Sequence, residues 1–350
     1  MYELKVKASL KYGITVARDL NALGEKTAPF MKGEKVAVVT DDNVFALYGD
    51  VIDCLAAGKT VVKIVLKHGE RHKNAASYLK IINTLAENGF TREDTVIAFG
   101  GGVVGDVAAF AASTYMRGIT LIAVPTTLLS MIDSSVGGKT AIDLKCGKNL
   151  CGTFYQPSAV YINFGFLRTL PEKEMKNGLG ELAKYALLSR KVTEKDIKSP
   201  TMRTIYNCLK IKRDIVNKDE KEKGIRAYLN LGHTVGHAIE KLSGYRVPHG
   251  IAVANGLVYA VKVSAKIYGI SDAESKRVFS AIKATGIKFR RRYPAKAITE
   301  EIYNDKKRRG SDIVFAAIKG AGEPSTVKIS VKDLGALLEE IDGELTENGY

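Results

Sequence analysis

The chain has 350 residues, 45% of them hydrophobic, and a formal net charge of +15 at pH 7. This length allows two globular domains, each with its own core. The most apolar stretch, ITLIAVPTTLLSMI, is interrupted by Pro125 and two threonines well short of a membrane span, and no basic-then-apolar leader opens the sequence, so we expect a cytoplasmic protein without a membrane segment. The basic residues are spread along the chain without interleaved aromatic residues, which favours an anionic small-molecule substrate over nucleic acid.

The first half of the chain alternates short β-branched runs with helical stretches. Four runs are apolar nearly throughout, as strands covered on both faces of a parallel sheet would be, over residues 35–40, 60–66, 95–100 and 119–125. The segments between them have helical spacing, and the one over 75–89 ends at Gly89. The pattern predicts an α/β domain with a mostly parallel, Rossmann-like sheet.

The second half of the chain reads as helical. From about residue 171 the β-branched runs disappear, and long helical patterns follow over residues 172–189, 201–216, 233–244 and 256–269. We therefore predict two domains, an α/β domain over residues 1–170 and an all-α domain over residues 171–350.

A glycine-rich turn follows the third predicted strand. GGGVVG at residues 100–105 has the spacing G-x-G-x-x-G, in which backbone N–H groups at a helix N-terminus approach a pyrophosphate. The acidic residue usual about 20 residues later is missing, whereas Asp41 and Asp42 end an earlier strand and Asn43 follows. The motif alone fits either a dinucleotide site or a tight turn without a ligand.

A polar loop follows the fourth predicted strand. Gly138-Lys139-Thr140 resembles the end of a phosphate-binding P-loop, but Asp133 stands where that motif requires glycine, so we do not expect an ATPase. The loop runs on through Asp143 and Lys148 to Asn149 and could hold a small, oxygenated, anionic substrate. Exposed loop lysines without a function are the alternative.

Three of the five histidines lie within twenty residues. His233 and His237 are four apart in a predicted helix, so they share one face, and His249 follows a proline. The glutamate of the HExxH motif is missing, so a zinc peptidase is not indicated. A zinc site with open positions usually combines histidines with a carboxylate, for which Glu181 is the best candidate, and one histidine would remain for proton transfer. A pair of buried core histidines is the alternative.

Six stretches together resemble the 3-dehydroquinate synthase family, over about residues 35–320: GGGVVGDVAAFAASTYMRG, VPTTLLSMIDSSVGGKTAID, GKNLCGTFYQP, NGLGELAKYALL, LNLGHTVGHAIE and the HG of residues 249 and 250. The resemblance implies an NAD-binding first domain and a second domain that binds metal and substrate. It implies conversion of the sugar acid phosphate DAHP into 3-dehydroquinate and phosphate, the second step of the shikimate pathway. In that reaction NAD+ is used and regenerated within one turnover, and a divalent metal, zinc or also cobalt, is bound.

The resemblance also implies roles for individual residues. The metal ligands correspond to Glu181, His233 and His249. Positions similar to NAD contacts are Asp41, Asn43, Glu70, Lys73, Gly101, Gly102, Val103, Asp106, Thr126, Thr127, Lys148, Phe166 and Thr169. Positions similar to substrate contacts are Asp133, Lys139, Lys148, Asn149, Lys184, Lys212, Arg226, Asn230, His233 and Lys307 or its neighbour Lys306. Catalytic positions correspond to His237 and Glu222 for proton transfer, and to Lys139, Asn149 and Arg117.

Arg117 matches an arginine that family members reach across a dimer interface, which implies a homodimer. One departure from the family is the stretch between Glu181 and His233, which is shorter than expected and bears on the assignment of Lys212. The alternatives are sister sugar phosphate cyclases, metal-dependent polyol dehydrogenases that release NADH, and a basic binding protein without catalysis.

Overall fold

The computed structural model describes the chain apart from residues 19, 55, 57, 291–292, 307–311 and 348–350. The chain divides into two compact units, Met1–Pro171 with Lys212–Glu220, and Glu172–Ile211 with Lys221–Tyr350. The first unit thus includes Lys212–Glu220, a segment that a single boundary after residue 170 places in the second domain.

The first unit is built on a seven-stranded sheet with the order β1-β2-β9-β6-β5-β3-β4. Each neighbouring pair is parallel except β1 and β2, which are antiparallel, so the expected mostly parallel sheet is confirmed. The strands are β1 (Tyr2–Lys7), β2 (Lys11–Ala17), β3 (Lys35–Asp41), β4 (Thr60–Leu66), β5 (Thr95–Gly100), β6 (Thr120–Pro125) and β9 (Ala159–Asn163).

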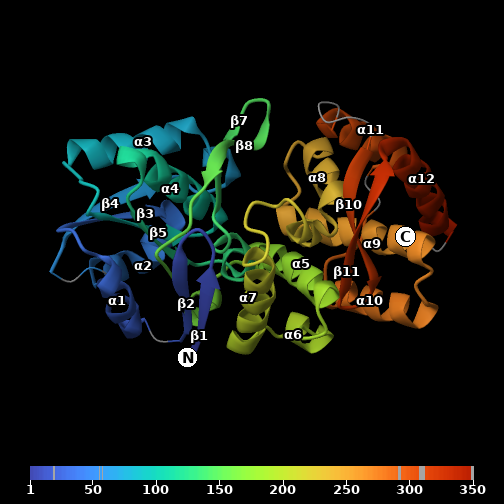
Figure 1. Ribbon diagram of the computed structural model, residues 1–350, viewed down its shortest axis with the longest axis horizontal. Helices are drawn as coiled ribbons and strands as arrows, with labels where there is room; N and C mark the ends of the chain where they lie inside the picture. Colours follow the sequence, from blue (N-terminus) through green and yellow to red (C-terminus); the bar gives the residue numbers. More distant parts are fainter. Residues whose placement is uncertain (19, 55, 57, 291–292, 307–311, 348–350) are drawn as a thin grey trace. The chain divides into compact units, whose positions relative to one another are not determined.

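Helices cover both faces of this sheet. In Figure 1, α3 and α4 lie on one side and α1 and α2 on the other. The helical segments are α1 (Asn21–Thr27), η1 (Ala28–Phe30), α2 (Asp42–Cys54), η2 (Glu70–His72), α3 (Ala75–Glu87), α4 (Gly102–Thr114), η3 (Tyr115–Arg117), η4 (Ser130–Ser134) and η5 (Phe164–Arg168). A separate hairpin is formed by β7 (Lys139–Leu144) and β8 (Gly147–Phe154).

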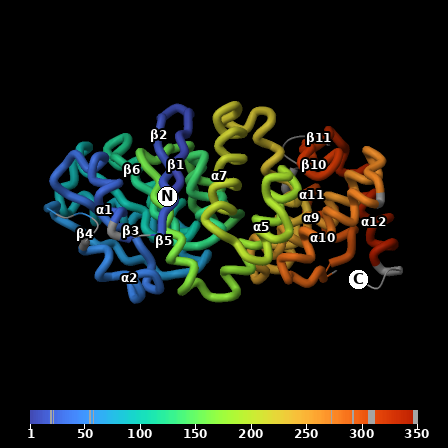
Figure 2. Tube along the Cα trace, turned by 90° about the horizontal axis from the view of Figure 1, so that it is seen from below, coloured from blue at the N-terminus to red at the C-terminus, as the bar shows by residue number. Residues whose placement is uncertain are grey.

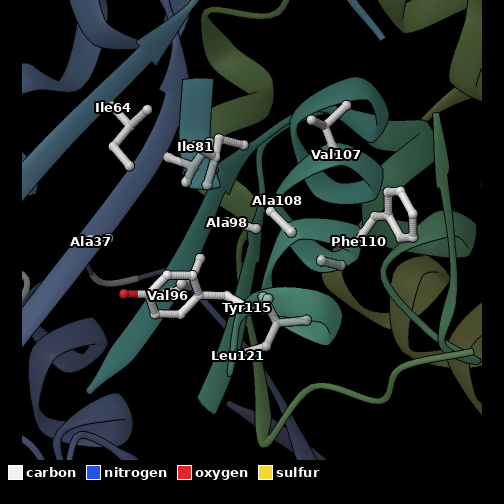
Figure 3. Packing of buried hydrophobic residues seen from close by; sticks show 14 of the residues in the cluster. Ala37, Ile64, Ile81, Val96, Ala98, Val107, Ala108, Phe110, Tyr115 and Leu121 are labelled. Carbon is white, nitrogen blue, oxygen red and sulfur yellow. The ribbon is translucent and has the colours of Figure 1, made fainter. Parts of the chain in front are cut away.

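The core of the first unit explains the continuous apolar runs. Every residue of β5 is buried, because α4 packs on one face of the strand and further apolar side chains cover the other. Figure 3 shows part of this core, where Ala37, Val96 and Ala98 of the sheet meet Ile81 of α3 and Val107 of α4. The predicted strands at residues 35–40, 60–66, 95–100 and 119–125 are confirmed.

The second unit is largely helical. Its helical segments are α5 (Glu172–Leu188), α6 (Glu194–Lys198), the first part of α7 (Met202–Val216), η6 (Ile225–Asn230), α8 (His233–Leu242), α9 (His249–Tyr268), α10 (Asp272–Ala284), α11 (Ala295–Lys306) and α12 (Val331–Glu347). Among these, α9 contacts α5, α8, α10 and α12, and Figure 2 shows it among its neighbours. By length and composition α9 could cross a membrane, but 72% of its apolar window is buried inside the protein, as in the core helix of a globular unit.

The second unit also contains an antiparallel hairpin, β10 (Asp312–Gly320) and β11 (Glu323–Ser330), which the expectation of an all-α domain did not include. On β10, Ile313 and Phe315 are buried whereas Val314 between them is 64% exposed, an alternation typical of a half-covered strand. The periodicity of a short apolar run does not distinguish a strand from a buried helix. DIVFAAIKG, at residues 312–320, forms a strand that contacts α9.

Candidate functional site

The carboxyl edge of the parallel sheet gathers the residues predicted to bind a dinucleotide. Asp41 ends β3 and Asn43 follows it, Glu70 and Lys73 follow β4, Gly101 to Asp106 follow β5, Thr126 and Thr127 follow β6, and Phe166 and Thr169 follow β9. From β3 the chain passes to β4 on one side and then to β5 on the other, so the strand order reverses between β3 and β5. In open α/β sheets, ligands bind in the crevice at such a switch point.

The glycine turn at the end of β5 is closely packed. A Cβ on Gly100 would lie 2.7 Å from Val104 Cβ, and one on Gly101 would lie 3.0 Å from Thr127 Cγ2. Gly101 is the N-cap of α4, so the first N–H groups of a 13-residue helix face the turn. The turn lines a small hollow together with Asp106, Ser134 and Lys139. This arrangement can receive an anionic group beside cationic and hydroxyl side chains.

Lys73 links three segments near this turn. Its Nζ lies 2.5 Å from Asp106 Oδ2 and donates to Asn149 Oδ1 at 2.5 Å, and its carbonyl accepts the N–H of Asp143 at 2.7 Å. Asp143 Oδ1 in turn accepts the N–H of Asn149 at 2.8 Å. Burial lowers the pKa of Lys73, but Asp106 and Glu70 outweigh it, so its pKa lies above the usual value and the side chain stays charged. The β7–β8 hairpin is thereby tied to the loop after β4.

Other predicted residues of the first unit have structural partners. Asp41 Oδ1 accepts the N–H groups of Asn43 and Val44, each at 3.0 Å, at the start of α2, and burial raises the pKa of this carboxyl. Lys148 pairs with Glu70 at 3.2 Å. Lys212 donates to the carbonyl of Asp133 at 2.7 Å and also contacts its carboxylate. These ion pairs bring most of the predicted cationic residues of the first unit beside carboxylates.

The side chain of Phe166 is buried among aromatic side chains. It is 2% exposed and packs against Phe99 and Tyr48, with ring centroids 5.5 and 4.9 Å away. The Tyr48 hydroxyl shares a hydrogen bond of 2.6 Å with Thr169 Oγ1. A contact between Phe166 and a nucleotide would therefore have to use its backbone.

The three histidines come together in the second unit. His233, His237 and His249 offer ring nitrogens that all lie within 4.8 Å of one another. Glu181 of α5 reaches the same point, because its Oε1 lies 3.3 Å from His233 Nε2 and 3.2 Å from His249 Nε2. Two zinc ligands, each about 2.1 Å from a tetrahedral ion, stand about 3.4 Å apart. The observed separations fit this spacing, so the residues present can hold a divalent metal.

Close backbone contact between α5 and α9 brings these ligands together. A Cβ on Gly180 would lie 1.9 Å from the carbonyl oxygen of Gly250, and one on Gly250 would lie 1.8 Å from that of Asn177. The Asn177 side chain also accepts the N–H of Gly250 at 2.6 Å. Since each glycine is the sequence neighbour of a candidate ligand, Glu181 or His249, the glycine contact sets the distance between the two ligands.

The two candidate ligand histidines, both half-buried, differ in charge. Burial lowers the pKa of His233 to about 3, so its ring is neutral at pH 7. Burial acts on His249 in the same direction, but hydrogen bonds with Glu181 and Glu240 raise its pKa to about 10. Both rings face Glu181, but His249 gains hydrogen bonds with Glu181 and Glu240, whereas His233 gains only the charge of Glu181 and lies near the cationic Lys184. Metals bind neutral imidazole, so binding at His249 would release a proton.

The remaining predicted residues of the second unit form polar contacts near the start of α8 and along α5. Asn230 donates to Glu222 Oε1 at 2.7 Å, and Lys184 pairs with Glu181 at 2.5 Å, both side chains being 1% exposed. Arg226 is among the largest fully buried side chains. Lys307 lies outside the described residues, as does the side chain of Lys306.

Three predicted residues have a backbone conformation that is rare for their type. Arg117, Asn149 and Glu222 have φ of 68°, 56° and 57°, and Met116 and Tyr245 are the other described non-glycine residues with positive φ. Strained backbone of this kind concentrates at functional sites. Arg117 is exposed in η3, as a residue that reaches a partner would be.

Three residues to which the sequence assigned no individual role hold the predicted ones in place. Glu240 lies 2.9 Å from His249 Nδ1, Asn177 caps α9, and Asp143 fixes the backbone of Asn149. Glu240 was accessible from the pattern, because it follows His237 by three residues on the same helix face. Asn177 acts across 73 positions, for which no local signal exists, whereas Asp143 lies six positions before Asn149 in the β7–β8 hairpin.

Comparison with solved structures defines the class of protein. The structure of 2-deoxy-scyllo-inosose synthase with carbaglucose-6-phosphate, NAD+ and Co2+ matches with a TM-score of 0.86 at 23% identity, covering 97% of this chain and 99% of that one. That of 2-epi-5-epi-valiolone synthase from Streptomyces hygroscopicus subsp. jinggangensis 5008, with NAD+ and Zn2+ bound, matches with a TM-score of 0.85 at 22% identity and the same coverage. The chain has the fold of the sugar phosphate cyclases.

Sequence comparison then gives the family. The 3-dehydroquinate synthase of Thermococcus kodakarensis is 43% identical over 299 residues, which are 85% of this chain and 84% of that protein. Family models for the N-terminal and C-terminal parts of 3-dehydroquinate synthase match residues 63–177 and 178–308. The chain belongs to the 3-dehydroquinate synthase family, and its activity is that of this lyase of the shikimate pathway.

Proposed function

We propose that the chain converts DAHP into 3-dehydroquinate and phosphate, with NAD+ used and regenerated in each turnover and one divalent metal, zinc or cobalt, bound. Beyond family membership, the observation that supports this most directly is the convergence of two histidine Nε2 atoms on one buried carboxylate oxygen, at 3.3 and 3.2 Å. A buried cluster of this composition is typical of a metal site that keeps a position open for substrate.

Glu181, His233 and His249 would hold the metal, which supplies Lewis-acid stabilisation of charge on substrate oxygens. The buried backbone contact at Gly180 and Gly250 holds two of these ligands at a fixed distance, and α8 supplies the third. His237, exposed and next to His233 with ring centroids 5.3 Å apart, would accept or donate a proton. An alternative ligand set is His233, His237 and His249, without Glu181. It shares His233 and His249 with the set proposed here.

Residues at the carboxyl edge of the sheet would hold NAD+, which supplies a reversible hydride acceptor. Asp41 and Asn43 would contact the adenosine end. The pyrophosphate would meet the turn and the start of α4, with Lys73 held beside it by Asp106. The other assigned positions are Glu70, Gly101, Gly102, Val103, Thr126, Thr127, Lys148, Phe166 and Thr169.

The cationic residues would orient the substrate through its carboxylate and phosphate. Charge-assisted hydrogen bonds to these groups are stronger than neutral ones and fix direction as well as distance. The ion pairs of Lys184 with Glu181 and of Lys212 with Asp133 hold both ammonium groups in place before any ligand arrives. The residues assigned to the substrate are Asp133, Lys139, Lys148, Asn149, Lys184, Lys212, Arg226, Asn230, His233 and Lys307.

Two further residues are assigned to the reaction itself. Glu222 would move a proton, and the hydrogen bond from Asn230 holds its carboxylate in one orientation. Arg117 would act in the partner's site of a homodimer, and its exposed, left-handed backbone supports this use. We place the enzyme in the cytoplasm, where the phosphorylated substrate and NAD+ are present.

The direct test follows phosphate release from DAHP by the purified chain with NAD+ and zinc, while absorbance at the NADH wavelength is recorded. We expect phosphate and 3-dehydroquinate in equal amounts and no net NADH. Release from sedoheptulose 7-phosphate or glucose 6-phosphate instead would assign the chain to a sister cyclase, and steady NADH production from a polyol would assign it to a dehydrogenase. Light scattering of the same sample tests the dimer.

A further inference from the structure

Glu240 is a buried carboxylate beside the candidate metal site. Glu240 is 3% exposed and lies in the last turn of α8, three residues after His237 and seven after His233. Burial disfavours a charged carboxylate, and the negative end of the helix dipole disfavours it further. A specific partner must offset both effects.

That partner is the ring of His249. Glu240 Oε2 lies 2.9 Å from His249 Nδ1, whereas the other ring nitrogen, Nε2, lies 3.2 Å from Glu181 Oε1. When Nδ1 carries the proton and donates it to Glu240, the lone pair of Nε2 is directed at the point where Glu181 and His233 converge. His233 has a weaker version of this contact, since its Nδ1 lies 3.2 Å from the carbonyl oxygen of Leu231.

We infer that Glu240 is a positioning residue of the metal site, which holds His249 in the tautomer and orientation that present Nε2 to a divalent ion and makes that nitrogen a stronger ligand. Carboxylates that accept from a ligating histidine act in this way, and their loss typically weakens metal binding by about 10-fold to 100-fold. The inference rests on the proposed function, in which His249 is a metal ligand.

The test measures zinc binding by Glu240→Gln and Glu240→Leu, using competition with a chromogenic chelator. The glutamine keeps an acceptor for Nδ1 but loses the charge, so we expect its zinc Kd to rise about 10-fold, and that of the leucine variant to rise about 100-fold. The visible absorption bands of the cobalt-loaded protein should shift in both variants, because His249 no longer has its orientation fixed. If the leucine variant fails to fold, the zinc Kd and cobalt spectrum of the glutamine variant still test the role of Glu240.

The matched control is Asp342→Asn. Asp342 is a buried carboxyl of the same unit that accepts from the Tyr259 hydroxyl at 3.2 Å, and Tyr259 lies ten residues beyond His249 on α9, about 15 Å along the helix. This variant should lose thermal stability but keep the wild-type zinc Kd and cobalt spectrum.

The outcomes distinguish a failure of the role inferred for Glu240 from a failure of the proposed metal site. Wild-type protein that binds zinc, together with Glu240 variants of unchanged Kd and spectrum, would overturn the role of Glu240 alone. Wild-type protein that binds no zinc would overturn the metal site and, with it, this inference. An equal loss of affinity in the Asp342 control would show a general effect of destabilisation and would also overturn it.

Discussion

Replacing Gly180 by alanine should separate two metal ligands without removing either. The added Cβ would lie 1.9 Å from the carbonyl oxygen of Gly250, so α5 and α9 would have to move apart locally by about 1.1 Å to reach 3.0 Å, below which such contacts essentially never occur. Glu181 follows Gly180 directly, and His249 precedes Gly250. The separation of 3.2 Å between Glu181 Oε1 and His249 Nε2 would therefore grow by a similar amount.

Metal sites tolerate about 0.2 Å of change in ligand distance, so this shift would detach one ligand. We expect the zinc Kd of Gly180→Ala to rise about 100-fold or more, while overpacking lowers the free energy of unfolding of the zinc-free protein by about 1–3 kcal/mol. Chelator competition measures the first quantity and urea denaturation the second.

Gly343→Ala makes the same chemical change in another helix of the same unit. Apart from its chain neighbours and the nearby backbone of α12 itself, nothing lies within 4 Å of the added Cβ, so this variant should gain up to about 1 kcal/mol of stability and keep its zinc affinity. If Gly180→Ala bound zinc as tightly as Gly343→Ala does, then backbone packing at Gly180 would not control the ligand distance, and the reasoning would be refuted.

Three further predictions concern single side chains. His233→Ala should abolish zinc binding and activity while circular dichroism remains that of the wild type, and full activity after chelation of the wild type would contradict the zinc assignment. Lys73→Met leaves the half-buried carboxylate of Asp106 without this cation, so we expect a loss of about 2 kcal/mol in urea denaturation and weaker NAD+ binding. Lys63→Met removes a partly exposed ion pair and should change stability by less than about 1 kcal/mol. Burial raises the pKa of Asp143 above 3.8, so the stability linked to its protonated form is lost as the pH rises through the folded-state pKa. Asp143→Asn should therefore be more stable than wild type in urea at pH 7 and lose this advantage as the pH falls towards 4, whereas a constant difference would contradict the buried carboxyl.

The predicted elements were found where the sequence pattern was both long and regular. The apolar run at residues 95–100 and the helical pattern at residues 75–89 correspond to β5 and α3 almost residue for residue. The strands that were not expected, β1, β2, β7 to β11, are short or half exposed, and their formation depends on a neighbouring strand or helix. Periodicity records which residues are buried, and it cannot show which partner buries them.

Parts of the candidate site could likewise be predicted from local sequence, and other parts could not. Local sequence alone indicated the glycine turn and the shared face of His233 and His237, because these features depend on spacing within one helix or one turn. Glu181 lies on another helix and was chosen from the ligand preferences of zinc, not from spacing. The roles of the polar residues came from resemblance to a family, and no local pattern carried them.

What only the tertiary structure decided is which distant residues meet. Glu181 and His249 are 68 positions apart, and their 3.2 Å approach depends on a backbone contact between two helices that only glycine permits. The same holds for Glu240 beside His249 and for Lys73 between Asp106 and Asn149. Spacing along the chain determines geometry within an element, whereas contact between elements is determined by how their surfaces pack, which depends on all of the core residues at once.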